Sequence, residues 1–309
     1  MMAKTLLIAA LAAAPAFGQG NGAPTVTFEA PTYFVSGGQF QVELTIEAAP
    51  GGSTAAAWWF TPAGFMVDGK PIQRRESDAL IELAPNASMT LSYDLGPYLE
   101  VDGSFELSFA QGAYDGEPIA VQMFEAVTTR GEGAVDFMEA PADELDQYLV
   151  VLETNRGTMV AEFWPDVAPN HVRNYLDLSG SGFYDGTLFH RCIPGFMIQG
   201  GDPQTKDPSK SRLWGTGGGP RKLEAEFNER THDRGVLSAA RSQDPDSASS
   251  QFFVMHARAP HLDRNYSAFG KVISGLDVVD RIVTSPRGAQ DRPNEPQQLV
   301  RVVVVKRSE

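Results

Sequence analysis

Alternation of apolar and polar residues in the first half of the chain is the strongest constraint on its fold. Residues 40–47 read Phe-Gln-Val-Glu-Leu-Thr-Ile-Glu, and residues 89–95 and 105–109 repeat the same period of two. Because side chains alternate across a strand, this period predicts half-buried β-strands. Gly, Pro and Asn turns separate the segments, which favours antiparallel pairing. Several such strands within residues 19–129 predict an immunoglobulin-like β-sandwich domain.

Residues 1–18 have the pattern of a secretory signal peptide. Lys4 precedes the apolar run of residues 5–14, and cleavage after Ala16 or after Gly18 fits the small residues that follow. The run is too short to span a bilayer comfortably. No later segment is apolar enough to cross a membrane. We therefore expect an exported protein, periplasmic or secreted, without stable membrane insertion.

The acidic residues are distributed unevenly. Residues 21–146 hold 20 Asp and Glu against 4 Lys and Arg, a net charge of −16, whereas residues 147–309 hold 19 against 20, a net charge of +1. An acidic half disfavours nucleic acid and anionic membranes as partners. The interpretations that stay open are a solvated face that keeps the protein soluble, or a surface that steers basic, unfolded protein clients or docks onto another protein.

The sequence pattern changes after the alternating segments. Residues 130–146 are rich in Gly, Pro and acidic residues, which predicts a linker. Residues 149–154 and 158–163 are apolar, strand-like segments on either side of a turn at residues 155–157. They predict a β-hairpin at the start of a second domain, residues 147–309.

Two helices are predicted in this second domain. Pro169 suits a first helical position, and the apolar residues that follow share one face until Gly180. Ser274 is predicted to cap a later helix that ends before Pro286. Residues 300–305 read Val-Arg-Val-Val-Val-Val and predict a final strand.

Residues 189–202 carry the clearest functional signal in the chain. At their centre, Pro194 biases Ile193 toward an extended conformation, and Gly195 allows a sharp change of direction. Beyond this bend, Met197 and Gln199 share one face of a strand. The planar, always-charged guanidinium of Arg191 thus lies beside an apolar wall, which suits a neutral, apolar substrate with one polar group.

This segment resembles the signature of the cyclophilin family of peptidyl-prolyl cis-trans isomerases. Residues 249–253, Ser-Ser-Gln-Phe-Phe, and residues 269–272, Phe-Gly-Lys-Val, match further family segments, and the resemblance covers residues 148–306. It implies an eight-stranded antiparallel β-barrel capped by two helices. It also implies an enzyme that isomerises X-Pro bonds during protein folding, acting on proline-containing peptides and unfolded protein clients without a cofactor or a metal.

The resemblance also implies roles for individual residues. Arg191 is the implied catalytic arginine, and Gln199 orients it or holds the substrate carbonyl. The implied substrate-binding residues are Phe196, Met197, Phe253 and Leu262 around the proline ring, Ala240 and Arg241 where the backbone pairs with the peptide, Gln251 in the same groove, and His261 and Tyr266. The last two stand where many eukaryotic members have a tryptophan and a histidine, and the missing indole donor of the tryptophan argues against tight cyclosporin binding.

Other interpretations of these residues lead to different classes of protein. Taken singly, the apolar residues fit an ordinary core and Arg191 fits an ion pair, so a non-catalytic peptide-binding module or chaperone on the same fold is the second hypothesis. Residues 215–219 are glycine-rich, but no Lys-Ser/Thr follows to complete a phosphate-binding loop. Cys192 is the only cysteine, and strand alternation turns it away from Arg191, which predicts a buried residue and not a nucleophile.

Overall fold

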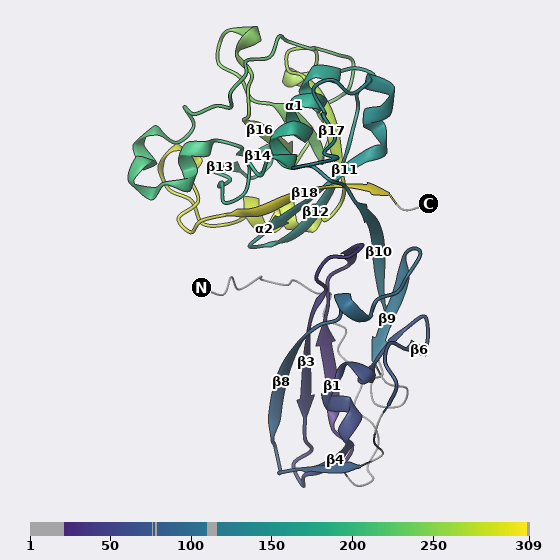
Figure 1. Ribbon diagram of the computed structural model, residues 1–309. Coiled ribbons are helices and arrows are strands. Elements are labelled where there is room, and N and C mark those ends of the chain that lie inside the picture. Colours follow the sequence, from purple (N-terminus) through teal and green to yellow (C-terminus); the bar gives the residue numbers. More distant parts are fainter. Residues whose placement is uncertain (1–21, 76, 78, 110–115, 308–309) are drawn as a thin grey trace. The chain divides into compact units, whose positions relative to one another are not determined.

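The computed structural model describes residues 22–75, 77, 79–109 and 116–307 (Figure 1). The predicted signal peptide lies outside these residues. The described chain forms two compact units, one ending at Ala126 and the other beginning at Val127. None of the helices described is long and apolar enough to span a membrane.

In its described residues, the first unit contains β-strands and three short 3-10 helices, η1 (Ala57–Phe60), η2 (Pro62–Gly64) and η3 (Gly96–Tyr98). Its strands are β1 (Thr25–Glu29), β2 (Tyr33–Val35), β3 (Gln41–Glu47), β4 (Ser53–Ala56), β5 (Phe65–Val67), β6 (Lys70–Pro71), β7 (Leu80–Leu83), β8 (Ser88–Asp94), β9 (Phe105–Phe109) and β10 (Ile119–Ala126). One antiparallel sheet has the order β1-β3-β8. A second has the order β6-β5-β9-β10, with β2 added in parallel to β10, and β4 pairs with β7.

The two sheets share one apolar core. Alternate residues of β3 and β9 are buried in it, as the period of two predicts. The rings of Phe28 on β1 and Phe65 on β5 meet edge to face with their centroids 5.6 Å apart, so side chains from both sheets are in contact. Met89 on β8 is 45% exposed, because β8 lies at the edge of its sheet. The predicted strands are confirmed, whereas the immunoglobulin-like class stays a prediction.

The second unit contains the eight-stranded antiparallel barrel that the resemblance implies. Its strands are β11 (Tyr148–Thr154), β12 (Gly157–Phe163), β13 (Arg191–Ile193), β14 (Met197–Gly200), β15 (Val236–Ala239), β16 (Phe252–Met255), β17 (Ala268–Ser274) and β18 (Leu299–Arg307). They pair antiparallel in the order β13-β14-β16-β15-β17-β12-β11-β18. The segment that precedes β13 also bonds to β18: the Gly186 N–H donates to the Leu299 carbonyl and the Leu299 N–H donates to the Thr187 carbonyl, each at 2.8 Å.

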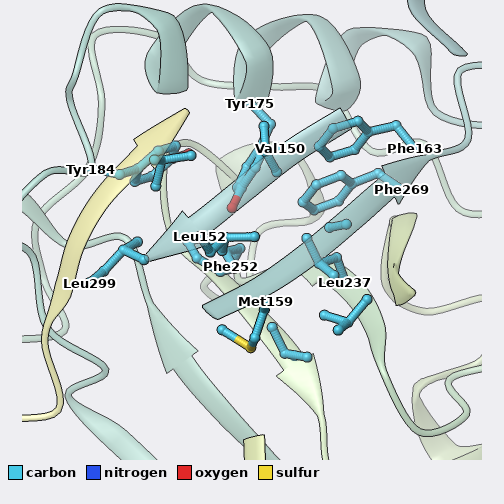
Figure 2. Packing of buried hydrophobic residues seen from close by; sticks show 14 of the residues in the cluster. Val150, Leu152, Met159, Phe163, Tyr175, Tyr184, Leu237, Phe252, Phe269 and Leu299 are labelled. Carbon is cyan, nitrogen blue, oxygen red and sulfur yellow. The ribbon is translucent and has the colours of Figure 1, made fainter. Parts of the chain in front are cut away.

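Two helices, α1 (Pro169–Gly180) and α2 (Leu276–Val283), pack against this barrel. Both contribute buried apolar side chains to the cluster inside the barrel, which we call the interior core and which includes Val150, Leu152, Tyr175, Phe252 and Val279. Figure 2 shows Tyr175 of α1 lying against Val150 and Leu152 of β11 within this core. Phe163 and Phe269, on neighbouring strands, stack beside it with interplanar angle 5°. The mainly β architecture predicted for this half is therefore confirmed.

The two helices begin in different ways. After Pro169, the N–H groups of the next two residues of α1 donate to the Glu226 carboxylate, each at 3.0 Å. The predicted cap of α2 was wrong: Ser274 ends β17, and Gly275 occupies the N-cap position with φ 83° and no side-chain bond. A β-carbon at this position would collide with the carbonyl of Thr158, so the tight approach requires glycine where the cap was expected.

Residues 130–146, predicted as a linker, belong to the second unit and contribute to its core. The Arg130 Nε–H donates to the carbonyl of Gly180 at 2.8 Å. Phe137 and Leu145 are almost fully buried in the interior core, and the Phe137 ring meets Tyr148 edge to face at 5.1 Å. The segment differs from a free linker because its few apolar side chains are buried. The Gly, Pro and acidic residues around them dominate its composition, and for this reason the composition did not indicate the burial.

Candidate active site

Strand pairing places the predicted polar and apolar site residues on one face of the barrel wall. Arg191 on β13 pairs with Gln199 on β14, and Gln199 pairs with Phe253 on β16. Directly paired residues project to the same side, and Met197, two positions from Gln199, does so as well. These four side chains, from three adjacent strands, therefore point outward together.

The intervening residues point the other way. Cys192, Ile198 and Val254 belong to the buried interior core. Burial raises the pKa of the Cys192 thiol to about 12, so the thiol stays protonated near neutral pH. The prediction that Cys192 is a small buried residue and not a nucleophile is confirmed.

A second apolar cluster, which we call the outer cluster, lies on the outward face. Its buried members are Met197, Val236, Phe253, Met255, Ala259, Leu262 and Ala268, and its partly buried members are Trp164, Ile193, Phe196, Ala240 and Tyr266. Tyr266 meets the Phe253 ring edge to face at 5.8 Å, and the exposed His261 stacks on Phe196 at 5.6 Å. All the apolar residues that the resemblance assigns to substrate binding are thus in one cluster.

A row of hydrogen bonds runs beside the outer cluster. Gln251 Nε2 donates to the carbonyls of Gly215 at 3.0 Å and Gly217 at 2.7 Å, so its Oε1 is turned toward Gln199. Gln199 Nε2 donates to this Oε1 at 3.0 Å, which leaves Gln199 Oε1 facing Arg191 Nη1 at 3.5 Å. Because an amide has one donor end and one acceptor end, the loop carbonyls set the orientation of both glutamines.

The glycine-rich loop in this row is fixed by a buried carboxylate. Asp202 is fully buried and accepts N–H bonds from Gln204 at 2.8 Å, Gly215 at 2.5 Å and Gly217 at 3.2 Å. A β-carbon on Gly217 would collide with the Asp202 carboxylate. These loop amides already bind an anionic side chain, which agrees with the sequence argument against a phosphate-binding loop.

Ala240 and Arg241 lie at the edge of the outer cluster. The Ala240 N–H donates to the backbone carbonyl of Gln251 at 2.9 Å, so this group is already occupied. The Arg241 guanidinium lies 4.5 Å from the Tyr266 ring centroid and donates to the carbonyl of Asn265 at 2.9 Å. Both residues therefore support the rim of the cluster, and pairing of their backbone with a peptide stays a prediction.

A buried polar network behind Phe253 was missed by sequence reasoning. His232 stacks on the Phe253 ring at 6.2 Å, with its Nδ1 3.1 Å from Asp263 Oδ1 and its Nε2 3.0 Å from Ser238 Oγ. Burial lowers the pKa of His232, which favours the neutral imidazole. Asp263 is 31 positions away along the chain, so no local spacing signals the network.

This Asp–His–Ser arrangement resembles a nucleophilic triad but cannot act as one. Ser238 and His232 are both fully buried, and the Ser238 hydroxyl donates to the carbonyl of Ser267 at 3.0 Å. A nucleophile must reach its substrate. The network therefore supports Phe253 from behind.

The electrostatics around Arg191 are those of a partly exposed cation. Its side chain is 42% exposed, and its Nε lies 3.8 Å from Asp291 Oδ2. His190 beside it is buried, and the loss of hydration lowers its pKa. Across the described residues, no group of three or more His, Cys, Asp or Glu side chains is arranged to hold a metal ion.

Comparison with known proteins agrees with this geometry. The family described as cyclophilin type peptidyl-prolyl cis-trans isomerase/CLD matches residues 149–304. Peptidyl-prolyl cis-trans isomerase CYP18-1 of Arabidopsis thaliana is 41% identical over 161 residues, covering 50% of this chain and 94% of that protein. A peptidyl-prolyl cis-trans isomerase of Acinetobacter baylyi is 39% identical over 170 residues, covering 53% of this chain and 87% of that protein.

Among solved structures, a cyclophilin-type peptidyl-prolyl cis-trans isomerase of Cryptosporidium parvum, crystallised in the presence of the dipeptide Ala-Pro, is also similar. It is 33% identical with a TM-score of 0.46, and the match covers 50% of this chain and 98% of that one. The family match spans half of the chain, and the Arabidopsis relative is covered almost completely. The chain therefore belongs to the cyclophilin family and is a peptidyl-prolyl cis-trans isomerase.

Proposed function

We propose that this protein is an exported isomerase that accelerates X-Pro isomerisation in folding proteins, with Arg191 as its catalytic residue. The reaction breaks no covalent bond. Its barrier of about 18–20 kcal/mol is the loss of amide resonance when the C–N bond twists. An active site therefore needs neither a nucleophile nor a metal, only a preference for the twisted amide over both planar forms.

Arg191 supplies the donor that the twisted amide requires. On twisting, the proline nitrogen becomes pyramidal and gains a lone pair, which accepts a hydrogen bond that the planar amide nitrogen cannot accept. The 42% exposure of Arg191 leaves its guanidinium accessible, and Gln199 Oε1 faces one edge of it at 3.5 Å. A fixed donor that acts on the twisted amide alone lowers the barrier without tightening ground-state binding.

The outer cluster suits the proline ring. Its buried floor of Met197, Phe253 and Leu262 excludes water from an apolar ring laid on it, and Phe196 and Ala240 are partly exposed at its edge. Burying such a ring is favourable by roughly 25 cal/mol per Å² of apolar surface. The crystallisation of the Cryptosporidium relative with Ala-Pro supports the same class of ligand.

One observation carries this proposal. The hydrogen-bonded side chains of Arg191, Gln199 and Gln251 lie on the same face of the barrel wall as the apolar side chains of Met197 and Phe253. The test is NMR exchange spectroscopy on a short Ala-Pro peptide with the full chain. We expect the protein to accelerate cis–trans exchange at catalytic concentrations. Peptide resonances that shift on binding while the exchange rate stays at its uncatalysed value would instead identify a non-catalytic binding module.

Export and client recruitment complete the proposal. Residues 1–18 support export, which is tested by determining the N-terminus of protein recovered from the exported fraction. A mature N-terminus after Ala16 or Gly18 is expected, and an intact Met1 on exported-fraction protein would contradict it. The net charge of −16 in residues 21–146 supports recruitment of basic, unfolded clients near the catalytic unit.

A further inference from the structure

The loop of residues 286–293, between α2 and β18, approaches the catalytic arginine from the side opposite Gln199. Asp291 Oδ2 lies 3.8 Å from Arg191 Nε, and Asp291 Oδ1 lies 3.5 Å from Arg287 Nε. Gln199 faces Nη1 of the same guanidinium. We propose that Asp291 is a positioning residue that holds the Nε edge of Arg191, so that a terminal N–H remains directed at the proline nitrogen.

The backbone of this loop is folded to place Asp291. Gln290 and Asp291 both adopt positive φ, 62° and 56°, a region that non-glycine residues rarely enter. The Gly288 N–H donates to the Arg292 carbonyl at 2.8 Å, and the Asn294 N–H donates to the Pro286 carbonyl at 2.8 Å. Two consecutive residues of this kind persist only where surrounding contacts fix them, and such strain concentrates at functional sites.

A second contact connects this loop to the glycine-rich loop. The Arg292 guanidinium lies 4.8 Å from the Trp214 ring centroid, and Trp214 Nε1–H donates to the Asp207 carbonyl at 3.3 Å. Trp214 directly precedes Gly215, whose carbonyl orients Gln251. Arg191 is thus connected to both loops. Gln199 and Gln251 connect it to the glycine-rich loop, and Asp291 connects it to the 286–293 loop. The contact between Trp214 and Arg292 connects the two loops to each other.

The expected size of the effect follows from the exposure of the ion pair. The two side chains are 42% and 38% exposed, so water and salt screen their attraction. Partly exposed pairs of this kind contribute little, and loss of the pair should lower kcat about two- to fivefold. Because Asp291 does not touch the substrate in this account, KM should change much less than kcat.

The test uses the full chain, exchange spectroscopy on a neutral Ala-Pro peptide, and the variant Asp291→Asn. Asparagine has the same shape and tolerates positive φ, so the loop is retained while the charge is lost. We expect the two- to fivefold fall in kcat at about 20 mM salt and a much smaller difference from the wild type at about 500 mM salt. The ¹⁵Nε resonance of Arg191 should shift in the variant, which reports on positioning without reference to activity.

Two further variants separate positioning from loop structure. Asp277→Asn removes a comparable surface ion pair, to Arg281 at 2.7 Å on α2, and should leave kcat unchanged. Arg287→Gln removes the other partner of Asp291 and should not reproduce the loss. The proposal is overturned if Asp291→Asn behaves as Asp277→Asn does, if the loss persists at high salt, or if Arg287→Gln causes the same loss.

This inference rests on the proposed role of Arg191, and the two can fail separately. If Arg191→Lys retains full activity, the arginine mechanism itself is wrong. If Arg191→Lys is inactive but Asp291→Asn has wild-type kcat and an unshifted Arg191 resonance, only the positioning role of Asp291 is wrong.

Discussion

Replacing Gln251 by leucine tests whether the hydrogen-bonded row orients the catalytic arginine. In the wild type, Gln251 Nε2 is held by the carbonyls of Gly215 and Gly217, and its Oε1 accepts from Gln199 at 3.0 Å. Leucine fills a similar volume but has neither a donor nor an acceptor. The Gln199 amide then loses the contact that distinguishes its two ends, and its NH₂ group can turn toward Arg191.

The magnitude follows from the bonds that are lost. A hydrogen bond between neutral groups contributes about 0.5–1.5 kcal/mol, and one to a charged group about 1.5–3 kcal/mol. The Arg191–Gln199 contact is long at 3.5 Å, so the lower part of the charged range applies. A loss of about 1.5–2 kcal/mol in transition-state stabilisation corresponds to a fall in kcat/KM of roughly 10- to 30-fold.

The assay is kcat/KM for a short Ala-Pro peptide, measured beside two comparison variants. Gln204→Leu removes the 3.1 Å bond that Gln204 Nε2 donates to Thr216 Oγ1 of the same glycine-rich loop. Gln204→Leu leaves Gln199 and Gln251 in place, and its kcat/KM should stay near that of the wild type. Gln251→Glu keeps an acceptor for Gln199 Nε2 and should lose less activity than Gln251→Leu. A folded Gln251→Leu variant within twofold of the wild type would refute the orientation argument.

Four further outcomes are expected. The value of kcat should be nearly independent of pH between about pH 6 and 8, because guanidinium groups do not deprotonate in proteins. A change in kcat with a midpoint near about pH 6.5 would implicate a histidine instead. Burial lowers the pKa of His190 and His232, so the unfolded chain binds protons that the folded chain does not. The two neutral histidines therefore contribute to the free energy of unfolding above the ordinary histidine pKa of about 6.5. This contribution is lost as the pH falls from there through the lower pKa values that the histidines have in the folded protein. Denaturant unfolding should therefore show lower stability at pH 5 than at pH 7, and equal midpoints would contradict this. A chain beginning at Val127 should fold and turn over peptide normally but lose, at low salt above all, its advantage on basic clients. A chain beginning at Gln147 should be destabilised by several kcal/mol, because Phe137 and Leu145 leave the core; equal thermal stability of the two truncations would show that this burial contributes little.

Much of the site could be predicted because it depends on local periodicity. The side-chain alternation across residues 191–199 is enough to separate Arg191, Met197 and Gln199 from Cys192, and the paired strands preserve that separation. The barrel itself was implied by the resemblance, since local patterns of strand and helix do not specify which strands are neighbours.

What could not be predicted depends on contacts between residues distant in sequence or on close backbone approach. His232 and Asp263 meet only once β15 and β17 are in place, and no spacing in the sequence links them. Gly275 displaced the expected Ser274 cap because the Thr158 carbonyl lies against it, a constraint visible only in three dimensions. Phe137 and Leu145 were hidden by the polar composition around them, although each is buried.

The most direct test of the central claim is the activity of Arg191→Lys, measured by exchange spectroscopy on an Ala-Pro peptide. Lysine keeps the positive charge but replaces a planar fork with a mobile point charge. If Arg191 donates to the twisted amide, kcat/KM should fall about 10²- to 10³-fold, as for loss of a transition-state donor elsewhere, while the peptide still binds. Near-wild-type activity in a folded Arg191→Lys variant would contradict the mechanism.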